Sequence, residues 1–131
     1  GVQAFIHALT LTDENKYSLV FEYTEADTPI VRFSADSNCV CQSVTPYPNN
    51  IIITAPHHGS DANQNVYSQI RGNDIIWVRS DRKSRKRPCA AFKSQANRYC
   101  LACRNRNFKA ELRFEYDGNR WQHITGNSCT C

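Results

Sequence analysis

Two adjacent histidines are the residues of this chain best placed to do chemistry. His57 and His58 follow the β-branched run from Ile51 to Thr54 and lead into Gly59. A neutral imidazole at the end of a rigid strand is a good zinc ligand, and a glycine beside it leaves room for a substrate. A two-residue motif is also compatible with ordinary loop histidines, so the neighbouring elements must decide between the two interpretations.

A carboxylate is expected at the same edge of the sheet as these histidines. Residues 17–23 and 30–34 alternate as strands do, and the second run is followed at once by Asp36. The next apolar strand begins after a Pro/Asn-rich break and ends at the histidines. Neighbouring strand ends can meet at one edge, so Asp36, His57 and His58 are predicted to lie together.

This order of elements resembles the second half of the metallo-β-lactamase fold. It is most similar to the branch that carries the hydrolase domain of DNA-uptake competence proteins and the phosphorylcholine esterases. That branch has an Asn followed by Ser-Leu-Val, which residues 15–20 match, and a Gly-Asp, for which this chain has Ala35-Asp36. Its His-His-Gly-Ser is matched in full by residues 57–60, and the resemblance covers roughly residues 3–98.

The resemblance implies a metal-dependent hydrolase that acts on a phosphodiester or a related ester. Asp36 would bridge two metals, His58 would bind the second metal, and His57 would support the site or contact the substrate. These three residues are therefore the catalytic candidates. The metals would lower the pKa of a bound water and stabilise the charge that develops on the ester.

The first half of that fold is expected to be missing from this chain. The family's main metal signature, His-x-His-x-Asp-His, does not occur here, and the complete fold needs about twice the sheet. The chain is therefore predicted to be a fragment or a reduced relative. Catalytic metals are expected only when the missing N-terminal half, or a partner chain, supplies the other ligands.

A second departure from the family lies downstream, where Lys86-Arg87-Pro88 stands in place of Gly-His-Pro. An arginine cannot bind a metal or transfer protons at neutral pH, but it can bind a phosphate oxygen in a bidentate way. Arg87, Lys86 and Ser60 are therefore the predicted substrate-binding residues.

Charge is divided unevenly along the chain. Residues 1–60 carry six acidic and two basic side chains, a net charge of −4, whereas residues 61–131 carry fourteen basic and six acidic, a net charge of +8. Six of the nine residues from 79 to 87 are basic. Such a run is either a solvated loop or an electrostatic footprint for nucleic acid or another polyanion.

Seven cysteines form a separate pattern. Cys100-x-x-Cys103 and Cys129-x-Cys131 flank two alternating segments, 108–116 and 120–124, which are joined by an Asp-Gly turn. A hairpin there would bring the two pairs together as four ligands for a structural zinc. Disulfides and free thiols are the alternatives, and His123 is a less favoured ligand because it is expected on a strand. Cys39, Cys41 and Cys89 have no assigned role.

The remaining pattern completes an α/β architecture. An opening strand is expected within residues 1–12, one helix from Ser60 to Arg71, and a second from Pro88 to about Tyr99. The predicted fold is a mixed sheet with flanking helices (residues 1–98, half of an αββα sandwich) and a zinc-ribbon-like hairpin (residues 99–131). No apolar stretch approaches the length of a membrane span, and thiolate zinc ligands favour a reducing compartment such as the cytoplasm.

Three functions are compatible with these features. The first is the C-terminal part of a metal-dependent hydrolase, including nuclease-like activity. The second is a catalytically inert zinc-containing module that binds nucleic acid. The third is a structural interaction domain whose metal site has decayed.

Overall fold

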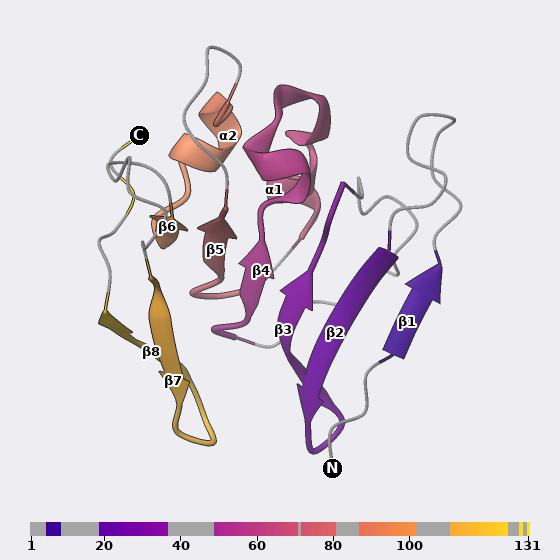
Figure 1. Ribbon diagram of the computed structural model, residues 1–131, viewed down its shortest axis with the longest axis vertical. Helices are drawn as coiled ribbons and strands as arrows, with labels where there is room; N and C mark the ends of the chain where they lie inside the picture. The colour runs from indigo at the N-terminus through magenta and orange to yellow at the C-terminus, as the bar shows by residue number, and fades with distance from the viewer. Residues whose placement is uncertain are drawn as a thin grey trace.

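Six strands form one mixed sheet in sequence order. The computed structural model describes residues 5–8, 19–36, 49–70, 72–80, 87–101, 111–125, 129 and 131. The strands are β1 (Phe5–Ala8), β2 (Leu19–Glu25), β3 (Thr28–Phe33), β4 (Ile52–Thr54), β5 (Ile76–Arg79) and β6 (Arg98–Cys100). β1 pairs with β2, and β2 with β3, in antiparallel fashion, whereas β3 to β6 run parallel to one another (Figure 1). The mixed sheet of the sequence prediction is therefore confirmed.

Local sequence explains the change from antiparallel to parallel pairing. The β2–β3 turn passes through Ala26 and Asp27, whose φ values of 47° and 62° match the twist of a tight hairpin. Strands β4 and β5 each begin with two buried apolar residues that point to opposite faces, as expected of parallel strands covered on both faces. Consecutive parallel strands need crossover segments, and these carry the helices.

The helices are shorter than the sequence predicts. They are η1 (Pro56–Gly59), η2 (Asp61–Asn63), α1 (Val66–Gln69) and α2 (Ala90–Lys93), and α1 and α2 lie near the C-terminal ends of the parallel strands (Figure 1).

The two long helices expected from Ser60 to Arg71 and from Pro88 to about Tyr99 are therefore wrong, because both observed helices are shorter. Ser60 does cap η2, since its Oγ accepts from the backbone N–H of Ala62, but α1 ends where Ile70 becomes extended. The second helix stops at Ser94, because residues 98–100 pair with β5 as a sheet edge. Tertiary strand pairing has overridden local helix preference there.

The core lies between the helices and one face of the parallel strands. Ile53 and Trp77 are paired across β4 and β5 and share this face, and Val66, Tyr67 and Phe92 pack against it. The Tyr67 ring meets Trp77 edge-on, with 4.7 Å between ring centroids. Each large side chain buried here stabilises the fold by about 1.5–3 kcal/mol.

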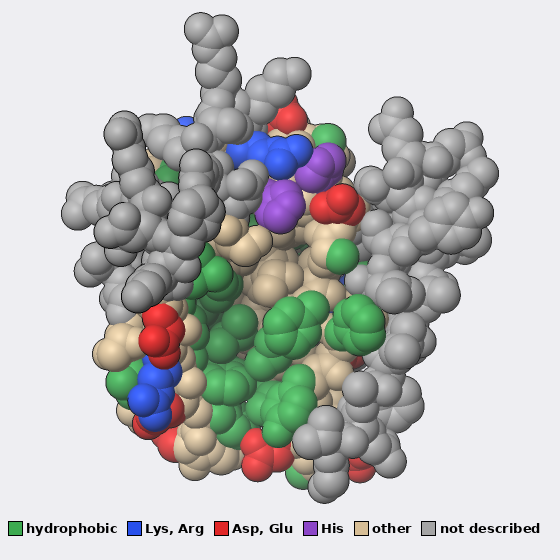
Figure 2. Space-filling model, in the orientation of Figure 1, with side chains coloured by type: hydrophobic (Ala, Val, Ile, Leu, Met, Phe, Trp, Pro, Cys, Tyr) green, Lys and Arg blue, Asp and Glu red, His purple; other side chains and the backbone are tan. Residues whose placement is uncertain are grey.

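The opposite face of the sheet is apolar and partly exposed. Phe21, Tyr23 and Phe33 lie on β2 and β3 and are 37%, 37% and 48% exposed. Figure 2 shows a broad group of hydrophobic side chains on one face of the molecule. Large exposed apolar patches are uncommon on monomeric proteins and mark interaction surfaces.

The C-terminal hairpin is confirmed, with a first strand that begins only at Arg113. Strands β7 (Arg113–Tyr116) and β8 (Trp121–Thr125) form a second, two-stranded sheet. It packs against the main sheet through the Tyr99 ring, whose centroid lies 5.1 Å from Phe114 and 4.6 Å from His123. His123 is thus part of an aromatic cluster.

Within the described ranges, no helix is both long and apolar enough to cross a membrane. The structure is α/β with a mixed sheet, few helices and a cysteine cluster near the C-terminus. The half-sandwich assignment stays a prediction.

Candidate functional site

The ends of β3 and β4 lie side by side. The backbone N–H of His57 donates to the carbonyl of Ala35 over 2.8 Å, and the N–H of Ser34 donates to Thr54 Oγ1, also over 2.8 Å. Asp36 is the residue after Ala35, and His58 is the residue after His57. The sheet therefore carries the predicted acid and both histidines to one edge.

Both strand ends turn through an unusual backbone conformation. Ala35, His57 and His58 have φ values of 45°, 45° and 54°, and Gly59 continues the turn at 80°. Non-glycine residues held in this left-handed region cost about 1 kcal/mol or more each, and they cluster at functional sites. The turn therefore presents two imidazoles in succession from a strained backbone.

Arg87 binds His57 through its guanidinium. Arginine Nη2 lies 2.8 Å from His57 Nε2, and a guanidinium can only donate. His57 Nε2 is therefore the acceptor, which places the ring proton of a neutral His57 on Nδ1. Figure 2 shows histidine, basic and acidic side chains gathered above the apolar face. Substrate-binding candidate Arg87 thus lies at the histidine site.

A buried arginine, Arg79, contacts the backbone of His58. Its backbone carbonyl accepts from Arg79 Nε over 2.8 Å, and its ring Nδ1 lies 3.2 Å from Ser80 Oγ. Arg79 is 0% exposed, so its place in an exposed basic run was wrong. The period-two alternation of β5, which puts Arg79 on the same face as Trp77, was the signal that could have identified it.

The other predicted substrate residues have different outcomes. Ser60 is buried and caps η2, which gives its hydroxyl a structural role. Lys86 lies outside the described residues, as does the rest of the basic run from 81 to 85. Residues 15–18, Cys39 and Cys41 also lie outside them.

Three of the four predicted zinc ligands come together at the C-terminus. Cys100 Sγ lies 2.8 Å from Cys129 Sγ and 3.9 Å from Cys131 Sγ. All three sulfurs are within 4.8 Å of one another, so the group could hold a metal ion. Cys103 lies outside the described residues. Cys100 and Cys129 are not part of a disulfide, whereas Cys131 is disulfide-bonded.

Burial raises the pKa of the Cys100 thiol to about 12, reinforced by its hydrogen bond with Cys129. Arg79 acts in the opposite direction, because its Nη1 donates to Cys100 Sγ over 3.9 Å. The same arginine thus touches both the cysteine cluster and the histidine turn.

The cysteines are the only group of three or more potential metal ligands among the described residues. Asp36, His57 and His58 do not form such a group. A catalytic zinc takes three protein ligands, so these side chains do not complete a catalytic metal centre within that part of the chain.

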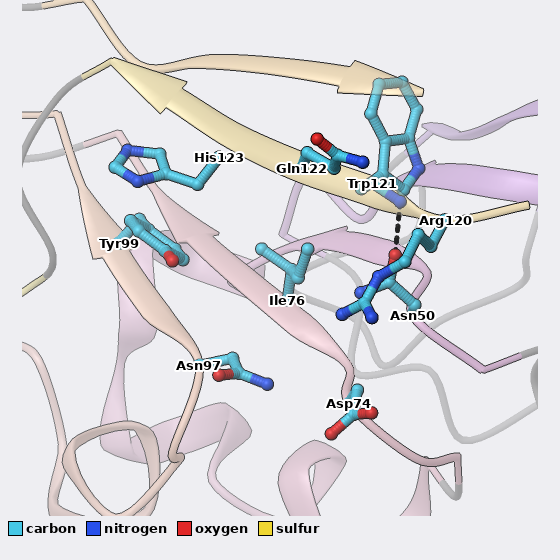
Figure 3. A pocket seen from close by; sticks show the side chains of 9 residues that line it. All are labelled: Asn50, Asp74, Ile76, Asn97, Tyr99, Arg120, Trp121, Gln122 and His123. Atoms are coloured by element: carbon cyan, nitrogen blue, oxygen red, sulfur yellow. Dashed lines mark hydrogen bonds between the residues drawn. The ribbon is translucent and has the colours of Figure 1, made fainter. Parts of the chain in front are cut away.

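A separate polar pocket was not foreseen from the sequence. It has a volume of about 420 Å³ and is lined by residues that include Asp74, Asn97, Tyr99 and Arg120. Figure 3 shows Asp74, Asn97 and Arg120 around Ile76, beneath β8. These residues precede β5, β6 and β8, so the pocket lies at the N-terminal ends of the parallel strands, away from the histidines.

Comparison with protein-family models, curated proteins and solved structures gives no match to this chain.

Proposed function

We propose that this chain is the C-terminal part of a metal-dependent hydrolase of the metallo-β-lactamase superfamily, acting on a phosphodiester or related ester. The observation that carries the proposal is the hydrogen bond between His57 and Ala35, which joins the ends of two parallel strands. It brings Asp36 beside the His-His-Gly-Ser turn, as the resemblance requires. The strained backbone of that turn supports a functional role.

Substrate contact in this proposal belongs to Arg87 and His57. Their hydrogen bond uses one of the five N–H donors of the guanidinium and fixes the orientation of the imidazole. Arginine matches the geometry of phosphate oxygens, and its charge would offset that of a phosphodiester. Both side chains are half-buried, which strengthens such a contact relative to one in bulk water.

The metal ligands in this proposal are Asp36 and His58. A bound metal would supply a water of lowered pKa and would stabilise charge on the ester. Because these two side chains fall short of a complete ligand set, hydrolysis requires a further segment that carries the histidine-rich signature.

The exposed apolar face supports that requirement. Phe21, Tyr23 and Phe33 form a surface of the kind that a second sheet covers in an αββα sandwich. We infer that the N-terminal half of the fold, on this or a partner chain, packs there.

A structural zinc at Cys100, Cys103, Cys129 and Cys131 completes the proposal. The sulfur separations of the three described cysteines support it, and the metal would anchor a hairpin that is too small to be stable alone. Zinc binding requires Cys131 as a thiolate, so it excludes the disulfide at that residue.

Manganese binding tests the hydrolase proposal. Mn²⁺ prefers carboxylate and imidazole ligands to thiolates, so it separates the Asp36–His58 pair from the cysteines. We expect Mn²⁺ to broaden the ring NMR signals of His58 and to spare those of His123. Asp36→Asn should abolish the broadening, and Asp117→Asn is the matched control. Broadening that is absent, or that survives Asp36→Asn, would refute the metal role.

Activity provides the second test. The isolated chain should not hydrolyse bis(p-nitrophenyl) phosphate with Zn²⁺ or Mn²⁺, because its ligand set is incomplete. Metal-dependent hydrolysis by the chain alone, lost in Asp36→Ala, would show that no further segment is needed.

The inert binding module is the second candidate, and one observation favours it. Arg87 places a cation at Nε2 of His57, which suits an anionic ligand without a metal. This candidate predicts that a single-stranded oligonucleotide binds less tightly to Arg87→Met than to Arg120→Met. It also predicts that Asp36→Asn leaves this binding unchanged and that Mn²⁺ has no effect on His58.

A further inference from the structure

The polar pocket beneath β8 contains an acidic and a basic side chain that do not pair with each other. Asp74 and Arg120 both line this cavity of about 420 Å³, a volume within the range of about 300–1,000 Å³ that small-molecule sites occupy. Among the described residues, these two side chains form no ion pair with one another. Arg120 also interacts with the charge of Asp117, but that carboxylate already accepts two backbone N–H groups in the hairpin turn. Two opposite charges that face one cavity without neutralising each other suit a ligand that carries both charges.

The walls of the pocket are fixed by hydrogen bonds between elements. The backbone N–H of Trp77 on β5 donates to the carbonyl of Asn97, which precedes β6, over 2.9 Å. The indole N–H of Trp121 on β8 donates to the carbonyl of Ile30 on β3, also over 2.9 Å. Buried Ile76 forms an apolar floor between these walls (Figure 3). A ligand therefore meets side chains whose backbone positions are already set, which lowers the ordering cost of binding.

An asparagine beside Arg120 has a fixed amide orientation. Oδ1 of Asn50 accepts from the backbone N–H of Trp121, the residue that follows Arg120 (Figure 3). Because the oxygen is used in this contact, the NH₂ group of Asn50 is the donor that can face a ligand. An amide donor next to a guanidinium is suited to a carboxylate.

The other end of the pocket carries two rings. The ring centroids of Tyr99 and His123 lie 4.6 Å apart. Tyr99 is two residues beyond Asn97 on β6, and His123 is three residues beyond Arg120 on β8. The rings therefore lie farther along the strands than the charged pair, as Figure 3 shows. Aromatic side chains favour contact with other rings, so this end of the pocket suits an aromatic group.

We propose that this pocket binds a free α-amino acid with an aromatic side chain, in its zwitterionic form. Its ammonium group faces Asp74, its carboxylate faces Arg120 and the NH₂ group of Asn50, and its ring lies against Tyr99. The inference does not depend on the proposed hydrolase, because the pocket and the histidine turn lie at opposite ends of the parallel strands.

Ligand analogues test the two charges on the unaltered chain. L-Phenylalanine should shift the side-chain amide NMR signals of Asn50 and Asn97 and spare those of Asn63, which is buried in η2. N-acetylphenylalanine lacks the ammonium and phenylalanine methyl ester lacks the carboxylate, so each should bind at least about threefold more weakly. Equal binding of the three compounds, or unchanged amide signals, would overturn the proposal.

Substitutions in the chain must match these changes in the ligand. Asp74→Asn should weaken the binding of phenylalanine at least about threefold without weakening that of N-acetylphenylalanine, which has no ammonium for Asp74 to bind. Arg120→Met should likewise weaken the binding of phenylalanine but not that of its methyl ester.

Each variant has a matched control elsewhere in the chain. Asp27, like Asp74, is exposed and has a positive φ, 62° against 54°, but it lies in the β2–β3 turn. Arg113, like Arg120, is an exposed arginine of the hairpin, and it does not line the pocket. Asp27→Asn and Arg113→Met should leave all three affinities unchanged. If Asp74→Asn weakened the binding of N-acetylphenylalanine as much as that of phenylalanine, the zwitterion assignment would be wrong.

Discussion

Nη2 of Arg87 lies 2.8 Å from Nε2 of His57, so the ring atom through which this histidine could most readily bind a ligand already accepts a hydrogen bond. The two residues are brought together from η1 and from the segment that precedes α2. The backbone N–H of Cys89 supports the contact, because it donates to the carbonyl of Gly59 over 2.8 Å. The site therefore combines a neutral imidazole with a fixed positive charge.

Replacing Arg87 should change the tautomer of His57. In the unaltered chain, nitrogen NMR should find the ring proton on Nδ1, because Nε2 accepts from Arg87. Arg87→Met removes this donor, so Nε2-protonated His57 should increase at least severalfold, whereas Arg120→Met should have no effect. A ring proton on Nε2 in the unaltered chain would contradict the assignment.

Much of the fold follows from the sequence because its strands carry strong local patterns. The alternation of residues 30–34 and the apolar run that ends at Thr54 each correspond to an observed strand. The early end of α2 cannot be predicted from the sequence. Residues 98–100 have no local feature that distinguishes the end of a helix from an edge strand. Their pairing with β5 is a tertiary interaction, which propensity does not contain.

The candidate site is predictable only in part, for the same reason. The His-His-Gly-Ser motif and Asp36 can be read from strand ends, and the hairpin turn predicts that distant cysteines meet. The burial of Arg79 beneath His58 cannot be read from the basic run, whose composition is that of a solvated loop. Which basic residue of such a run becomes buried depends on long-range packing.

Asp117 should make the hairpin turn dependent on pH. Hydrogen bonds from the backbone N–H groups of Arg120 and Asn119 lower the pKa of Asp117 below 3.8. A lowered folded-state pKa stabilises the turn above 3.8, and this contribution is lost as pH falls through the folded-state pKa.

The test follows Trp121 fluorescence and hairpin NMR shifts from pH 5 down to about pH 2, since the carboxylate is protonated in this range. Asp117→Asn keeps an oxygen acceptor and should remove the pH step while retaining the turn. Asp117→Ala should weaken the turn at every pH. A step of equal size in Asp117→Asn would assign the pH dependence to another group.

Zinc affinity should rise with pH. Burial raises the pKa of Cys100 to about 12, so zinc must displace its proton at neutral pH. In the metal-free chain the same shift makes stability fall as pH rises from 9.0 towards about 12, because the unfolded chain loses the proton first.

Competition with a chromophoric chelator under reducing conditions measures this affinity. It should increase about tenfold per pH unit for each proton released. Cys129→Ser should lose about one zinc per chain and loosen the hairpin, with Trp121 fluorescence shifted towards that of exposed indole, whereas Cys89→Ser should retain the metal. Affinity that does not vary with pH would mean that the thiols are already ionised before the metal binds.

Gly59→Ala should destabilise the chain and disturb the histidine turn. Gly59 has a φ of +80°, and an added Cβ would lie 3.2 Å from Pro88 Cβ and 3.4 Å from Arg79 Cδ. The backbone strain alone costs about 1–3 kcal/mol, and displacement of Arg79 would withdraw the donor that holds the His58 carbonyl.

Gly118→Ala is a matched control, because its φ is +91° but no atom lies within 4 Å of the added Cβ. In urea unfolding, Gly59→Ala should lose more stability than Gly118→Ala, and only Gly59→Ala should shift the ring NMR signals of His57 and His58. Equal losses with unchanged histidine signals would show that the close packing of Arg79 and Pro88 on this turn does not hold it in place.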